Sequence, residues 1–178
     1  KWTLNLKFEA PRPIRIYGTN REPKIYWYIL YSARNDSGAT RFFAPDFILY
    51  TNEAKLHRSG IHPEVHKVIK ERRKRRTRFL ENSAKIIGNL LEGEDNARDG
   101  VAIFAPIGPK TKSFTLFVGG LSGRYILRDN PAAKADTPLA EKKIVLYKTL
   151  AVDYKLIGDE WWKDLAAPKV VKTQWTWR

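Results

Sequence analysis

The longest unbroken apolar segment is expected to form the centre of the fold. Residues 25–31 are all apolar or aromatic, and the segment lies between Pro23 and the polar cluster at 35–38, Asn-Asp-Ser-Gly. A continuous apolar run of this length predicts a β-strand that is covered on both faces. The polar cluster predicts a turn, because Asn, Asp and Gly tolerate the backbone angles that turns require. A second apolar run at 42–51 is expected to return as the hairpin partner of the first.

Other segments along the chain have the length and pattern of short strands. Residues 2–8 alternate between apolar and polar, which is typical of a strand buried on one face. Segments 101–107 and 113–119 predict a second hairpin, and 142–156 is long enough for one bent strand or two. Short strands separated by turns favour a mainly β fold, an antiparallel immunoglobulin-like β-sandwich of about eight or nine strands. We see no repeat of fixed period and predict a single domain, residues 1–178.

One segment has the period of a helix. Pro63 suits a first helical position, and the apolar residues Val65, Val68 and Ile69 share one helical face. These residues predict an inserted basic helix over 63–77. Residues 79–91 are ambiguous between a strand and an irregular segment.

The chain is strongly basic, with 33 Lys and Arg against 19 Asp and Glu, a net charge of +14. Segment 66–78 alone holds eight Lys or Arg and one Glu, and such charge favours acidic partners of any kind. Arginine binds phosphate well, which keeps a nucleic-acid-binding alternative open. Nucleic-acid modules usually place aromatic residues among the cations, however, and residues 67–78 contain none, so we favour an acidic protein partner. The expected partner-binding cations are Arg72, Arg73, Lys74, Arg75 and Arg76.

Several absences narrow the function. The chain has no Cys, which excludes disulfides, thiol catalysis and thiolate metal sites. It has no Met, even at position 1, and a chain that starts without an initiator favours an exported protein whose signal peptide was removed. We therefore expect an extracytoplasmic location, in a periplasm-like space or in the lumen of an internal compartment. No apolar run approaches the roughly 18 residues of a transmembrane segment.

The three histidines are candidate metal ligands, but their spacing fits a metal site poorly. His62 and His66 are four residues apart, but Pro63 disfavours a helical conformation at His62 and displaces the Glu that zinc proteases need. With His57 as the remaining candidate ligand, a metal-dependent function stays an alternative. We expect three partly exposed histidines and no cofactor.

No other group of residues has the spacing of a catalytic or ion-binding site. Gly108, Gly119, Gly120 and Gly123 lack the Gly-Lys-Ser/Thr ending of a phosphate loop. Ser113 and Ser122 have no nucleophile pattern around them. The acidic residues Glu92, Glu94, Asp95 and Asp99 lack the alternating spacing of a calcium loop. These absences favour a protein that is not an enzyme.

The end of the sequence is rich in tryptophan. Trp175 and Trp177 are two residues apart, so an extended chain would project both to the same side. The tail is expected either to be the last strand of its own sandwich, with both indoles in the core, or to pack against a neighbouring subunit. Tryptophan is a favoured interface anchor, so we count Trp175 and Trp177 among the partner-binding residues.

Three segments, KIYWYILYSARNDSG, FFAPDFILYTNEAKLHRSGIHPEVHKVIKERR and DGVAIFAPIGPKTKSFTLFVGGLSG, carry a family resemblance that covers roughly residues 2–154. In this order they resemble exported β-sandwich proteins of planctomycete-type bacteria, and also the tubule-forming subunits that accompany nitrite oxidoreductase in anaerobic ammonium oxidisers. The resemblance implies an immunoglobulin-like sandwich outside the cytoplasm and no catalytic residues. We therefore expect an exported, non-catalytic assembly subunit that acts through protein–protein contacts, polymerises into filaments or tubules and organises an enzyme complex. Its expected partners are an acidic protein, further copies of itself, or both.

Overall fold

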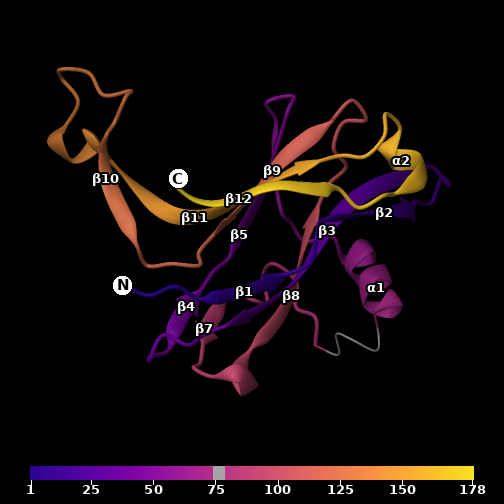
Figure 1. Ribbon diagram of the computed structural model, residues 1–178, viewed down its shortest axis with the longest axis horizontal. Helices are drawn as coiled ribbons and strands as arrows, with labels where there is room; N and C mark the ends of the chain where they lie inside the picture. The colour runs from indigo at the N-terminus through magenta and orange to yellow at the C-terminus, as the bar shows by residue number, and fades with distance from the viewer. Residues whose placement is uncertain (74–78) are drawn as a thin grey trace.

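The computed structural model describes residues 1–73 and 79–178 and consists mainly of antiparallel β-sheets (Figure 1). In the first, four-stranded sheet, β3 is the central strand. It pairs with β8 along one edge, and with β1 and β2 in succession along the other. The strands of this sheet are β1 (Asn5–Phe8), β2 (Arg12–Tyr17), β3 (Pro23–Arg34) and β8 (Arg98–Phe104).

The second sheet has six strands in the order β10-β11-β9-β5-β6, with β12 paired to the other edge of β11. Its strands are β5 (Asp46–Thr51), β6 (Leu56–Arg58), β9 (Ser113–Gly119), β10 (Tyr125–Asp129), β11 (Lys143–Lys155) and β12 (Lys169–Trp177). The remaining elements are the small sheet of β4 (Arg41–Phe43) and β7 (Gly88–Leu90), the helices α1 (Pro63–Arg72) and α2 (Trp161–Asp164), and two 3-10 turns, η1 (Glu94–Asn96) and η2 (Leu139–Glu141).

The prediction that the apolar run is covered on both faces is confirmed. On one face of β3, Trp27 and Tyr31 pack against the second sheet, with Trp27 fully buried and its ring centroid 5.3 Å from that of Phe114. On the other face, Leu30 lies in a second apolar cluster with Val65 and Ile69 of α1. The covering layers are therefore a sheet on one side and a helix on the other.

The helix begins as predicted and ends earlier. Pro63 is its first residue, where the missing N–H costs no hydrogen bond. The backbone N–H of Arg73 bonds the carbonyl of Ile69 at 3.1 Å and closes the last turn, so α1 ends at Arg72. Residues 74–77 of the expected helix lie outside the described part of the chain. A second helix, α2, was not expected, and it places Trp161 in the core.

Both predicted hairpins are wrong. Strands β3 and β5 belong to different sheets, and so do β8 and β9. The turn at 35–38 is real, but the chain then forms β4, which pairs with β7, before β5 begins in the other sheet. A turn signal marks where the chain changes direction and carries no information on which sheet the next strand joins. The described residues form strands β1–β12, more than the eight or nine expected, because the count includes β4, β6 and β7 with three residues each.

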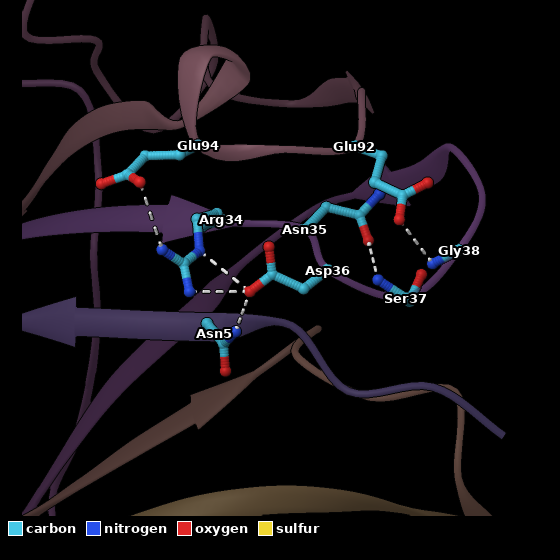
Figure 2. A network of polar contacts seen from close by, with 8 residues as sticks. All are labelled: Asn5, Arg34, Asn35, Asp36, Ser37, Gly38, Glu92 and Glu94. Atoms are coloured by element: carbon cyan, nitrogen blue, oxygen red, sulfur yellow. Dashed lines mark hydrogen bonds and ion pairs between the residues drawn. The ribbon is translucent and has the colours of Figure 1, made fainter.

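The turn after β3 is held by a buried asparagine (Figure 2). The Asn35 amide donates to the carbonyls of Ala39 and Leu90 at 2.8 and 2.9 Å, and its Oδ1 accepts the N–H of Ser37 at 3.0 Å. Asn35 is fully buried, so these bonds replace the water that its amide loses on folding. They fix the point where the chain leaves β3.

Candidate protein-binding surface

Strand β12 is an edge strand with an open side. It pairs antiparallel with β11 from Lys169 to Trp177, and within the described residues its other edge has no strand partner. Every residue from Lys169 to Gln174 is exposed, so both faces of this strand meet solvent. Proteins usually shorten or cover such an edge, because its free N–H and C=O groups are a template for another strand.

The pairing geometry shows which backbone groups point outward. Tyr147 and Arg178 exchange both N–H···O=C bonds, at 2.8 and 3.0 Å. Hydrogen-bonded pairs alternate with non-bonded pairs in an antiparallel ladder, so Thr173, Trp175 and Trp177 direct their backbone groups away from β11. The open edge therefore offers the N–H and C=O groups of these three residues.

The two tryptophans of this edge are not in the core. Trp175 is 44% exposed and Trp177 is 39% exposed, so the alternative that buries both indoles is wrong. Their positions pair with Leu150 and Lys148, and the Lys148 ammonium lies 4.4 Å from the Trp175 ring centroid. The cationic residues of this segment are Lys169, Lys172 and Arg178, with no acidic residue among them. The edge therefore combines exposed indoles, open backbone groups and positive charge.

The expected cationic site at the end of α1 is only partly described. Arg72 is exposed. Arg73 is engaged within the fold, because its Nη2 lies 3.3 Å from Glu9 Oε2 and its side chain is 16% exposed. Partial burial lowers the pKa of Arg73, but hydrogen bonds to Tyr28 and Glu9 and the charge of Glu9 raise the pKa by more. Arg73 therefore anchors α1 to the four-stranded sheet. Lys74, Arg75 and Arg76 lie outside the described residues.

The three histidines have separate surroundings. The His62 ring packs edge-on against Tyr26 at 5.3 Å, and a ring nitrogen of His66 lies 3.1 Å from the carbonyl oxygen of Leu80. Burial and the neighbouring charge of Lys55 lower the pKa of His57. Across residues 1–73 and 79–178, no group of three or more His, Asp or Glu side chains is placed to hold a metal ion.

The acidic and hydroxyl candidates have structural contacts. Glu92 accepts the N–H of Gly38 at 3.2 Å, and Glu94 faces Arg34 at 4.0 Å (Figure 2). Ser122 donates its hydroxyl to the carbonyl of Trp2 at 2.9 Å. The Ser113 N–H donates to the side-chain oxygen of Asn52 at 3.2 Å. These contacts join neighbouring segments of the fold.

The remaining candidates are also placed by the fold. Asp95 lies in the 3-10 turn η1, and Asp99 lies in β8. Gly108 precedes a turn closed by the N–H of Thr111, and Gly119 ends β9. Gly120 has a positive φ of 76°, and a Cβ there would lie 2.2 Å from the carbonyl oxygen of Ala44, so this tight corner requires glycine. The Gly123 N–H bonds the carbonyl of Trp2 at 3.2 Å.

A second surface was missed from the sequence. Strand β10 and residues 143–147 of β11 form a two-stranded ribbon that projects from the body, closed by the loop 130–142 (Figure 1). We call residues 125–147 the arm. Tyr125 pairs with Tyr147 and Leu127 with Val145, so these four side chains share one face, and all four are exposed. The only feature of the sequence that pointed to the arm was the length of segment 142–156. This segment is longer than the part of β11 that pairs with β9 and β12.

A groove of about 790 Å³ lies at the base of the arm. Its lining includes Gly119 and Thr149 of the body and Tyr147 of the arm. Charged groups at this groove are Arg178 and the pair Arg58–Asp46, whose atoms lie 2.8 Å apart. Phe42 and Trp2 are the other aromatic lining residues.

Comparisons of the chain with protein-family models, with curated proteins and with solved structures found no match. The resemblance to exported sandwich proteins and to tubule-forming subunits therefore stays a prediction. Within the described residues, neither helix has the length and apolar character that crossing a bilayer requires.

Proposed function

We propose that this protein is a non-catalytic assembly subunit that binds a protein partner along the open edge of β12. The observation that supports this proposal is the edge itself, a nine-residue strand hydrogen-bonded on one side, with two exposed tryptophans. An extended segment of a partner adds to such an edge through main-chain hydrogen bonds, while side-chain pockets supply specificity. The indoles would provide the buried anchors on which interfaces depend.

The charge of the edge favours an acidic partner segment. Lys169, Lys172 and Arg178 lie on β12 or directly after it, and the whole chain carries +14. Electrostatic complementarity of this kind speeds association and suppresses basic competitors. We further propose that the two packed antiparallel sheets are an immunoglobulin-like sandwich. An extracytoplasmic location, growth into filaments or tubules and the organisation of an enzyme complex remain predictions from the sequence.

The test uses proline at two neighbouring positions of β12. Thr173→Pro removes an N–H that points to the open edge, so the fold keeps its ladder while an added strand loses a bond. Gln174→Pro is the matched control, because it removes an N–H that faces β11 and should reduce folding stability instead.

The chain and its variants are expressed in the organism that naturally makes the protein, and the assemblies that contain them are purified. The size of these assemblies and the proteins in them are then measured. The wild-type chain is expected in an assembly larger than its own 20.6 kDa, and Thr173→Pro is expected to be released from it while remaining folded. Assemblies of unchanged size and composition in folded Thr173→Pro would refute the proposal.

A further inference from the structure

The arm carries apolar side chains on both faces. Within the described residues its two strands pair with each other, and only Tyr147 also bonds the body, through the backbone of Arg178. Tyr125, Leu127, Val145 and Tyr147 are exposed on one face, and the other face carries Ile126 and Leu146, which are half-buried. An isolated two-stranded ribbon is marginally stable in water and needs packing against another element. Exposed apolar patches of this kind mark interaction sites. The arm therefore has the composition of a ribbon that is covered in its working state.

We propose that the arm is a self-association device, in which two copies of this chain pair through their arms. The arms lie antiparallel about a two-fold axis, so the tip of each arm faces the groove at the base of the other. Such a contact is isologous, since each copy contributes the same arm and the same groove. This inference extends the proposed function and names one of its partners as a second copy.

Charge favours a second copy over the acidic partner expected at β12. The arm contains four cations and three acids, a net charge of +1 in a chain of +14. Two copies that meet at their arms therefore avoid most of the repulsion between two basic molecules.

The loop 130–142 at the tip of the arm has no net charge, because Asp136 and Glu141 are matched by Lys134 and Lys142. At the tip, Asp136 and Glu141 make no ion pair with any described residue, and neither does Arg178 in the groove. An antiparallel pairing of two arms brings these acids towards that arginine, and the same contact is repeated on the other side of the axis.

The exposed apolar area is of the size that a specific contact requires. Six large side chains are exposed on the arm and beside its groove: Phe42, Tyr125, Leu127, Leu139, Val145 and Tyr147. Side chains of this size that are about half exposed leave on the order of 100 Å² each. The pair of copies would then bury roughly 1,200 Å², at the lower bound for stable interfaces.

The first test removes apolar side chains from the arm. Leu127→Thr combined with Val145→Thr keeps strand propensity and should leave folding intact, because both side chains are already exposed. The matched control is Val170→Thr with Val171→Thr, which removes equally exposed side chains from β12. Sedimentation of the purified chain should give a concentration-dependent dimer, which the arm variant weakens at least tenfold and the control leaves unchanged.

The second test exchanges charges. Asp136→Lys with Glu141→Lys makes the neutral tip strongly cationic, and Arg58→Glu with Arg178→Glu makes the groove acidic. Each variant alone should dimerise more weakly than the wild type. Mixing the two variants should restore association, because in the mixed dimer the cationic tip meets the acidic groove and the other tip–groove contact is that of the wild type. Fluorescent labels on the two variants report the mixed dimer directly.

Three outcomes would overturn the proposal: a monomeric wild-type chain at about 100 μM, a dimer weakened by the β12 control and not by the arm variant, or no recovery on mixing. A failure of the proposed function gives a different result. In that case Thr173→Pro forms assemblies of normal size and composition, whether or not the arms pair.

Discussion

Tyr31 and Tyr154 bring phenol groups into the core from opposite sheets. The Tyr31 ring packs 4.6 Å from Phe47, and a Cβ on Gly100 would lie 2.3 Å from its Cζ, so the ring requires glycine at that position. Burial raises the pKa of Tyr154 to about 12. Burial, with the charge of Glu81 adding to it, also raises the pKa of Tyr31 well above its usual value. Both hydroxyls therefore stay neutral in the folded protein under ordinary conditions.

These shifts predict a loss of stability at high pH. In the unfolded chain tyrosine ionises near pH 10, whereas the folded protein keeps both phenols protonated to higher pH. The unfolded state therefore binds fewer protons above pH 10, and the free energy of unfolding falls as pH rises from about 10 through 12. Tyr154→Phe should reduce this fall by on the order of 2 kcal/mol, and adding Tyr31→Phe should reduce it further.

Urea denaturation between pH 9 and pH 12 measures the effect. Tyr17→Phe is the control, because it removes the same hydroxyl at a largely exposed position. Equal slopes for the wild type and the double variant would show that the two phenols do not govern alkaline stability.

At the scale of elements, α1 is a docked layer with a polar anchor at its end. Val65 and Ile69 bury its apolar stripe against β3 and β8, and Arg73 ties its last turn to Glu9 near the four-stranded sheet. In the sequence, Arg72 and Arg73 are adjacent members of one basic run, and nothing there distinguishes them. In the structure Arg72 is exposed, whereas Arg73 contacts Glu9.

The two arginines should therefore respond differently to the same substitution. Arg73→Gln is expected to lower the free energy of unfolding by about 1–2 kcal/mol, because a charge-assisted contact with Glu9 is lost at a mostly buried site. Arg72→Gln should change it by less than about 0.5 kcal/mol, as exposed substitutions usually do. Thermal unfolding of both variants gives the comparison, and equal effects would contradict the anchoring role of Arg73.

At the scale of the whole molecule, β3 connects the two apolar clusters. One of its faces contributes Trp27 to the cluster between the sheets, and the other contributes Leu30 to the cluster beneath α1. Both clusters depend on side chains of β3, so the loss of packing in one removes support from the other. The two clusters should therefore unfold together.

We therefore predict one cooperative unfolding transition for the chain. Tryptophan fluorescence reports chiefly on the sheets, and far-UV circular dichroism reports on all elements, so their denaturation curves should coincide. Two separated transitions would mean that α1 or another unit unfolds independently of the sheets.

The local pattern of the sequence was enough for most elements. Period-2 and continuous apolar runs predicted a mainly β, antiparallel fold and the burial of Trp27, because these depend on how one strand presents its side chains. Pro63 marked the first residue of α1, and the cluster at 35–38 marked the end of β3, because capping and turn chemistry act over a few residues.

Only the tertiary structure decided which strands pair and which side chains remain exposed. Pairing joins segments far apart in the chain, and nothing in a turn such as 35–38 distinguishes a hairpin from a crossing to the other sheet. The same holds for the candidate surface: Trp175 and Trp177 have the pattern of a core strand, yet they are exposed because β12 is the last strand at its edge. The sequence of the arm likewise has the pattern of an ordinary strand. The arm is exposed because β11 extends beyond β9 and β12. Burial depends on what covers a residue, and what covers it is set by the packing of distant segments.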